Sequence, residues 1–138
     1  MNIPMSIQKI QLTELPITDQ FLRQKRLIQE RGELALIEDG MTIQHLGYFS
    51  LLAGNGCRGG HYHKIKTEHF YVISGHILID LVDVETNASE QIELKAGTKA
   101  TIFPLLAHRF QAIQDAQVIE YYEGIFEATD DVSYNFDS

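Results

Sequence analysis

The chain is poor in cysteine, in basic residues and in long apolar runs, and each shortage excludes a class of protein. Its 138 residues include one cysteine, Cys57, so no disulfide can form within the chain. Lysine and arginine number 11 against 19 aspartates and glutamates, which gives a formal net charge of −8. So acidic a chain repels the phosphates of nucleic acids and of anionic membranes, and neither is an expected partner. No apolar run approaches the ~18 residues that a membrane helix needs.

The sequence also shows no internal repeats, linkers or low-complexity segments. Its first residues do not combine a basic start with an apolar stretch, as a signal peptide would. The expected location is therefore the cytoplasm, and Cys57 is expected to be structural. A chain of this length fits one domain that buries about two-thirds of its unfolded surface. We expect residues 1–138 to form a single domain.

What the sequence does contain is a succession of short strand-like segments. Residues 20–30 are charged, and their periodicity does not distinguish a helical turn from an irregular arm. Residues 70–73 and 77–84 read as a hairpin around Ser74-Gly75, and Gln114-Asp115 reads as a break between two later strands. The other expected strands are 7–12, 33–38, 45–53, the segment around His61, 92–94, 99–103, 108–113 and 118–122. About nine short strands with few helical patterns predict an all-β sandwich or barrel. The tail from residue 127 to residue 138 is expected on the surface.

Four side chains in this β-rich pattern are suited to binding a metal ion. His61 and His63 are two residues apart, so on an extended strand both imidazoles leave the same face. Glu68 and His108 follow at spacings that let neighbouring strands bring them alongside. Three imidazoles and one carboxylate suit Zn, Ni, Mn, Fe or Co, with positions left for water or substrate. The alternative is a polar barrel interior in which these groups bond only to one another.

The order of these residues resembles the two signatures of the cupin superfamily. The first is matched by His61-x-His63, Glu68 and Gly75, and the second by Gly97, Pro104 and His108. Asn55 stands where the first signature has glycine, and Leu105-Leu106 follows Pro104 where the second has a Pro-x-Gly turn. The resemblance implies a double-stranded β-helix, the jelly-roll barrel of cupins, with the four ligands inside.

Within the cupins, the chain is most similar to the WxcM-like nucleotide-sugar 3,4-ketoisomerases, which act on 4-keto-6-deoxyhexoses linked to dTDP. The matching stretches are 30–34, 47–49, 58–64 and 126–131, of which Arg58-Gly-Gly-His-Tyr-His-Lys64 is the distinctive one. The resemblance implies acid/base roles for His61 and His63. It also implies that Tyr48, Arg58 and Arg31 hold the substrate. Those ketoisomerases commonly have glutamine near the position of Glu68 and need no metal, so Glu68 marks a departure towards metal-binding cupins.

These observations lead to a hypothesis about function. We expect one divalent metal ion of unknown identity (Zn, Ni, Mn or Fe) and an isomerase or epimerase that moves protons on a keto sugar through an enediolate. His61, His63 or Tyr48 would move the protons. The basic residues Arg31, Arg58, Lys64 and Lys66 would bind an anionic sugar nucleotide, since arginine grips phosphate in bidentate fashion. The alternative for them is a solvated rim. His45, His69 and His76 are expected to be structural or solvated.

Two other functions stay open at this stage. A shell of three histidines and one carboxylate also serves iron- or nickel-dependent cupin dioxygenases, and a cupin can bind a sugar or metabolite without catalysis. A homodimer is expected, because an exposed N-terminal edge strand invites pairing with a second copy.

Overall fold

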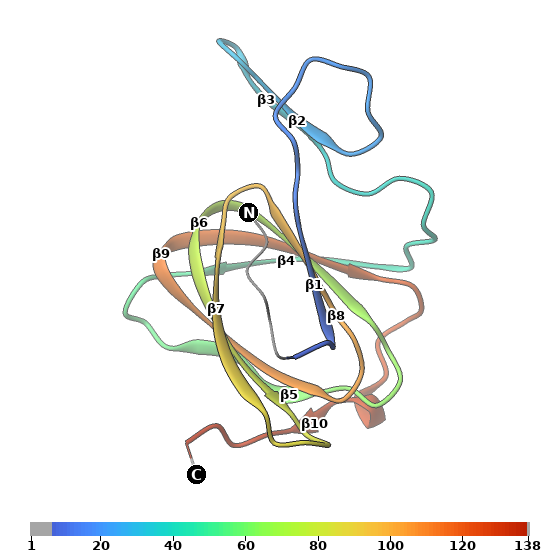
Figure 1. Cartoon of the computed structure of the whole chain (residues 1–138), viewed down its shortest axis with the longest axis vertical. Helices are drawn as coiled ribbons and strands as arrows, with labels where there is room; N and C mark the ends of the chain where they lie inside the picture. Colours follow the sequence, from blue (N-terminus) through green and yellow to red (C-terminus); the bar gives the residue numbers. More distant parts are fainter. Residues whose placement is uncertain (1–6, 138) are drawn as a thin grey trace.

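The computed structural model describes residues 7–137, and over that range it is built from β-strands and one short 3-10 turn (Figure 1). The elements are β1 (Ile10–Glu14), β2 (Lys25–Gln29), β3 (Gly32–Leu36), β4 (His45–Leu51), β5 (Cys57–Tyr62), β6 (Glu68–Asp83), β7 (Ser89–Lys95), β8 (Thr98–Ile102), β9 (Leu106–Tyr122), η1 (Ala128–Asp130) and β10 (Val132–Ser133). The prediction of an all-β fold is confirmed. No helix within residues 7–137 is long and apolar enough to cross a membrane.

The barrel is organised by two long antiparallel strands, β6 and β9, which pair with each other along nearly their whole lengths. The first half of β6 also pairs with β8 and its second half with β7. Similarly, the first half of β9 pairs with β5 and its second half with β4. Because each long strand changes its outer neighbour half-way, the sheet curls over on itself as the predicted jelly-roll barrel (Figure 1).

The core lies inside this curl, where alternate residues of the long strands point. Ile77, Ile79 and Leu81 of β6 and Val118 of β9 are fully or almost fully buried. In an antiparallel pair, residues directly opposite each other point to the same face of the sheet. The register therefore identifies the inner face along every strand, which is needed to place the functional side chains.

The predicted hairpin around Ser74-Gly75 is wrong, and so is the predicted break at Gln114-Asp115. Residues 68–83 form one strand, and so do residues 106–122. Their pairing shifts register between Val72 and Ile77, so the turn-forming residues here produce a bulge and a bend. Gly75 adopts a φ of +88°, a conformation that favours glycine.

The charged segment 20–30 forms strand β2, which pairs with β3 in a hairpin that stands away from the barrel (Figure 1). An ion pair of 2.6 Å between Arg26 and Glu33 joins its two strands. At its base, the ammonium group of Lys99 bonds to Glu38 at 3.2 Å. The hairpin exposes apolar side chains, among them Ile28 and Leu34.

Candidate metal centre

The structure brings together all four side chains that the sequence suggests as metal ligands. One ligand atom from each of His61, His63, Glu68 and His108 lies within 4.8 Å of the others. His61, the last residue but one of strand β5, lies beside His108 on β9, its direct partner in the register. Glu68 begins β6, and His63 lies just beyond β5. His63, Glu68 and His108 are buried, whereas the side chain of His61 is 28% exposed, so His61 is the open side of the cluster.

A bulge in β5 aims His61 at the cluster. Arg58 pairs with Phe110, and His61 pairs with His108. The chain therefore advances three positions along β5 while it advances two along β9. Gly59 and Gly60, with φ of +91° and +82°, supply the extra residue, because an L side chain rarely adopts such angles. Arg58 and His61 consequently share the inner face, although a regular strand would place them on opposite faces.

The outer nitrogen of each imidazole is held by an oxygen atom. Nδ1 of His63 lies 2.8 Å from the carbonyl oxygen of Asp130, and Nδ1 of His108 lies 2.9 Å from that of Leu106. A carbonyl only accepts, so in both rings Nδ1 carries the hydrogen and Nε2 keeps its lone pair. Nδ1 of His61 lies 3.0 Å from the carboxylate of Asp131. This second layer of partners is what orients metal-ligating histidines in proteins.

The inner atoms of the cluster lack donors among the described residues. Nε2 of His63 lies 2.8 Å from Oε1 of Glu68, and Nε2 of His108 lies 3.3 Å from the same oxygen. All three atoms are buried, and none has a hydrogen-bond partner of good geometry in residues 7–137. Lone pairs that face one another need a proton or a cation between them. The residues therefore fit a divalent metal ion.

The pKa values follow from the same contacts. Burial raises the pKa of Glu68, but the close contacts with the imidazoles of His108 and His63 outweigh it and hold that pKa well below its usual range. Burial lowers the pKa of His63, and the contact with Glu68 reverses this and raises it. Burial and then the neighbouring His108 lower the pKa of His61 to about 4, so this ring is neutral near pH 7. Because a metal ion needs a deprotonated ligand, it competes with the proton that His63 shares with Glu68.

The tail contributes a buried residue that the sequence analysis placed on the surface. Asp130, in η1, is only 6% exposed, so the expectation of a surface tail is wrong at this position. Its carboxylate accepts hydrogen bonds of 2.7–3.0 Å from the backbone N–H groups of residues 64–66. Burial raises the pKa of Asp130, but the three backbone bonds outweigh that effect and lower it. Asp130 therefore fixes the loop that joins His63 to Glu68.

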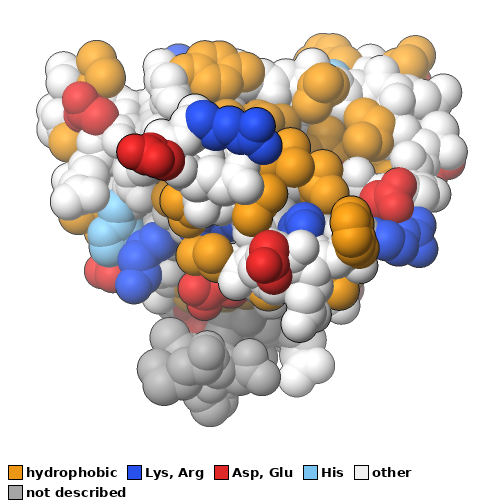
Figure 2. Space-filling model, turned by 90° about the horizontal axis from the view of Figure 1, so that it is seen from above, with side chains coloured by type: hydrophobic (Ala, Val, Ile, Leu, Met, Phe, Trp, Pro, Cys, Tyr) orange, Lys and Arg blue, Asp and Glu red, His pale blue; other side chains and the backbone are white. Residues whose placement is uncertain are grey.

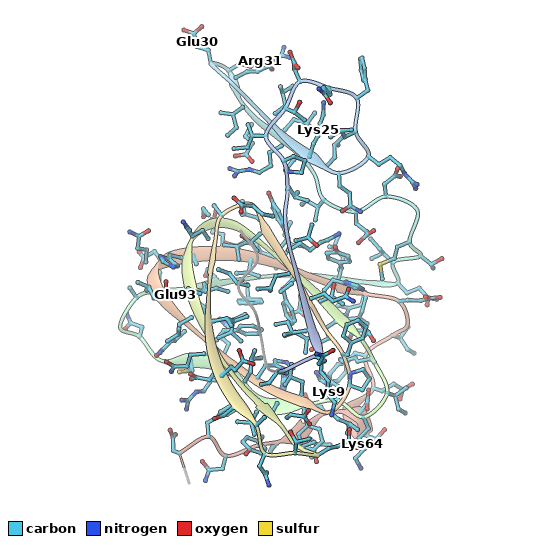
Figure 3. All side chains as sticks on the ribbon, in the orientation of Figure 1. Lys9, Lys25, Glu30, Arg31, Lys64 and Glu93 are labelled. Carbon is cyan, nitrogen blue, oxygen red and sulfur yellow. The ribbon has the colours of Figure 1, made fainter. Side chains whose placement is uncertain are left out.

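The substrate-binding residues suggested by the sequence lie in different places. Arg58 is on the inner face, with its guanidinium carbon 5.8 Å from the centre of the Phe49 ring. Figure 3 shows Arg31 at the tip of the β2–β3 hairpin and Lys64 at the opposite end of the molecule. Lys64 lines a cavity of ≈ 740 Å³ beside Asp130. Tyr48 is 58% exposed on the outer face of β4. Within one chain, the structure does not bring Tyr48 or Arg31 to the cluster.

Lys66, which the sequence suggests as one of the basic residues of an anion-binding pocket, is a direct neighbour of the cluster. Its ammonium nitrogen lies 3.9 Å from Oε2 of Glu68, and the side chain is only 12% exposed. The same nitrogen lies 4.3 Å above the ring of Tyr122, a cation–π contact. Lys66 thus joins the cluster to the end of strand β9. The parity of residues 66 and 68 on an extended strand is the sequence signal that could have suggested it.

Comparisons with known proteins agree with this fold. A family profile, the polysaccharide biosynthesis C-terminal domain, matches residues 29–131. No curated protein sequence matches the chain. Among solved structures, a 3,4-ketoisomerase (QdtA) from Thermoanaerobacterium thermosaccharolyticum, in complex with TDP, is 19% identical with a TM-score of 0.75, over 95% of this chain and 91% of that one. A mutant of that enzyme in complex with TDP-4-keto-6-deoxyglucose superposes with a TM-score of 0.76 at 18% identity, over the same shares of the two chains.

Two further solved structures share the architecture. A TDP-quinovose 3,4-ketoisomerase (WlaRB) from Campylobacter jejuni is 20% identical with a TM-score of 0.72, over 95% of this chain and 96% of that one. A dTDP-4-dehydrorhamnose 3,5-epimerase from Sulfolobus tokodaii is 20% identical with a TM-score of 0.75, over 96% of this chain and 81% of that one. The predicted resemblance to cupins, and to ketoisomerases among them, is confirmed at the level of the fold.

Proposed function

The chain belongs to the polysaccharide biosynthesis C-terminal domain family, and from that premise we propose that it is an isomerase or epimerase of a nucleotide-linked keto sugar. The observation that carries the proposal is the convergence of three imidazoles and one carboxylate within 4.8 Å inside the barrel. The shared fold with enzymes solved in complex with TDP or a TDP-keto sugar supports this class of substrate. An exposed thiol at Cys57 is consistent with the expected cytoplasmic location, where thiols stay reduced.

The chemistry of such a reaction explains what the site must do. A keto group acidifies the hydrogen on the neighbouring carbon, and a base that removes it leaves negative charge on the former carbonyl oxygen. We infer that His61, His63, Glu68 and His108 hold one divalent ion (Zn, Ni, Mn or Fe), which when bound supplies Lewis acidity towards a substrate oxygen. The backbone around Asp130 and the carbonyl of Leu106 keep the ring nitrogens aimed inward. Without a metal ion, His61 and His63 would be the acid/base pair.

A dioxygenase is the second candidate, since its iron or nickel uses the same four ligands. Arg58 on the inner face argues against it, because an oxygenase of small apolar substrates has little use for a guanidinium there. A cupin that binds a sugar without catalysis is the third candidate. Incubation of the purified, metal-loaded protein with TDP-4-keto-6-deoxyglucose, followed by proton NMR, distinguishes them. A moved carbonyl or an inverted carbon supports the proposal, whereas binding without conversion supports the third candidate.

Arg58→Ala is expected to weaken TDP binding and to leave metal binding unchanged. A chain of net charge −8 repels a diphosphate and needs close guanidinium contacts to hold it. Losing one charged hydrogen-bonding partner should cost about 2 kcal/mol, or roughly a 30-fold weaker affinity. Titration calorimetry with TDP measures this. Arg23→Ala, which removes an exposed arginine paired with Asp39, is the matched control. Equal TDP affinity of Arg58→Ala and the parent would exclude this role.

We also propose that the protein is a homodimer that pairs through the β2–β3 hairpin. A groove of ≈ 1140 Å³ between the hairpin and the barrel is lined by Phe21, Leu34, Leu46 and other apolar residues. Figure 2, which looks onto this end of the molecule, shows hydrophobic side chains among scattered charges. An exposed apolar surface of this kind is typical of an interaction site.

Light scattering is expected to give twice the 15.7 kDa mass of one chain. Leu34→Glu should shift the mass towards that of the monomer, because it places a charge in the apolar groove. Ile65→Glu, at a still more exposed apolar position at the other end of the molecule, should leave the dimer intact. A parent protein of 15.7 kDa at micromolar concentration would contradict the proposal.

A further inference from the structure

A second pair of ionisable side chains faces the interior of the barrel beside the metal-ligand cluster. His45 and Glu120 come from the paired strands β4 and β9, with Nε2 of His45 3.3 Å from Oε2 of Glu120. Each side chain is 30% exposed, so both are open to a ligand. From the sequence alone, His45 is expected to be structural or solvated, and Glu120 has no expected role.

The register places this pair on the inner face. Glu120 is directly opposite Gly47 on β4 and Phe70 on β6, and Phe70 is part of the buried core. His45 is two residues from Gly47 and directly opposite Tyr122, whose side chain is 1% exposed. Residues two apart on a strand share a face, so His45 and Glu120 belong to the same face as the core aromatics. Tyr48, by contrast, points outwards.

The pair lies one step along the sheet from the cluster. Glu68 precedes Phe70 by two residues, so Glu120 and Glu68 are diagonal neighbours on one face, with backbones roughly 7–8 Å apart. The ring of Phe70 contacts that of His108 at 6.1 Å between centroids. On the other side, His45 stacks on Tyr122 at 4.2 Å, and Lys66 links Tyr122 to Glu68.

Two polar atoms at the pair are free to bond to a ligand. Nε2 of His45 and the hydroxyl of Tyr122 are buried, and neither has a hydrogen-bond partner in residues 7–137. Buried polar atoms are normally bonded, so unpartnered atoms at one place indicate an absent polar ligand. Gly47 preserves the room, because a Cβ there would lie 3.0 Å from Cγ of Glu120 and 3.4 Å from Nε2 of His45.

We propose that Glu120 and His45 are the proton-transfer pair for a keto sugar held at the cluster, an inference that rests on the proposed function. Glu120 takes the proton from the carbon next to the carbonyl. The C–H electron pair becomes a C=C bond, and the carbonyl π pair moves onto its oxygen. The carbon that lost this proton also carries a hydroxyl group. His45 accepts the proton of that hydroxyl and returns a proton to the former carbonyl oxygen. Glu120 then delivers its proton to the former carbonyl carbon. The new carbonyl forms at the carbon from which Glu120 took the proton.

The cluster and the pair then have different roles, binding for the cluster and proton transfer for the pair. Nδ1 of each cluster imidazole lies against an oxygen atom, of Asp131 for His61 and of a backbone carbonyl for His63 and His108, and the other ring nitrogens of His63 and His108 face Glu68, so these rings are placed to hold and orient. Within residues 7–137, the contact with His45 is the one ion pair of the Glu120 carboxylate. The isomerisation moves one proton between carbons and one between oxygens, and the pair offers one acceptor for each.

The test is turnover of TDP-4-keto-6-deoxyglucose in D2O by Glu120→Gln and His45→Gln, each compared with the parent. Removing a general base should lower kcat by at least about 100-fold and slow deuterium incorporation at the former carbonyl carbon equally. TDP affinity and zinc content should stay within about twofold of the parent. The control is Glu93→Gln, which alters a similar pair, 3.2 Å from His76, on strand β7 away from the cluster (Figure 3). It should retain parental kcat.

The outcomes separate the two proposals. If the parent acts on the keto sugar and both variants match it, the role of the pair is wrong and the proposed function stands. If the variants lose TDP or zinc binding in proportion to kcat, the pair is structural and the inference is equally overturned. If the parent neither converts the sugar nor exchanges deuterium into it, the proposed function falls and the role of the pair with it.

Discussion

His63→Ala is expected to abolish tight zinc binding while the protein stays folded. The substitution removes one of four ligands and the buried partner that lies 2.8 Å from Glu68. Because losing even an outer partner of a metal ligand typically weakens affinity 10–100-fold, losing the ligand itself should weaken it by more than about 100-fold. The apolar core inside β6 and β9 does not include His63, so the barrel should remain folded without it.

Two measurements together check this expectation. Elemental analysis of the dialysed parent should give about one ion per chain after incubation with zinc, and none for His63→Ala. In thermal unfolding, zinc at 100 times its dissociation constant should stabilise the parent by about 2.7 kcal/mol and leave the variant unchanged. His76→Ala removes a histidine outside the cluster and should behave as the parent. If the parent retains no zinc, nickel, manganese or iron, the metal site is excluded and the reaction would have to proceed without a Lewis acid.

The metal-ligand cluster was largely predictable from the sequence because its ligands are encoded locally. Two histidines two residues apart share a face wherever the segment is extended, and a carboxylate five residues later begins the next strand. Only His108 reaches the cluster through the pairing of distant strands, and the resemblance to the second cupin signature identified it as a ligand. The outer partners were not predictable, since backbone carbonyls such as that of Asp130 carry no signal in the side-chain pattern.

Residues whose role depends on the register of distant strands were the ones that sequence reasoning missed. His45 and Glu120 are 75 positions apart in the numbering and meet because β4 pairs with the far half of β9. The direction of Tyr48 follows from the same register, which turns it outwards. The β5 bulge also changes which residues share a face, so counting along the sequence alone does not place Arg58 beside His61.

The strand boundaries were predicted where turns reverse the chain and missed where turn residues only bend it. Ser74-Gly75 and Gln114-Asp115 have turn composition, yet each lies within one continuous strand. The two sites lie together across the β6–β9 pair. Both strands bend at one place, and Gly75 is the residue that allows them to approach.

Gly75→Ala is therefore expected to be strongly destabilising. An added Cβ would lie 2.1 Å from the carbonyl oxygen of Asp115 and 2.7 Å from Cα of Ala116, both backbone atoms of the paired strand. The φ of +88° adds strain for any L side chain, about 1–2 kcal/mol. Separation of the strands to relieve the contact should cost a further 1–3 kcal/mol, so the total should be roughly 3–4 kcal/mol.

Chemical denaturation of Gly75→Ala and of Gly54→Ala separates the two contributions. Gly54 also has a positive φ, +77°, but no heavy atom lies within 4 Å of the position of its added Cβ. Gly54→Ala should therefore lose only the conformational part, roughly 1 kcal/mol. For a chain of this length, the additional loss in Gly75→Ala should lower the melting temperature by about 10 °C. An equal loss of unfolding free energy in the two variants would mean that β6 and β9 do not approach closely at this bend. The bulge between the two halves of the barrel would then be wrong.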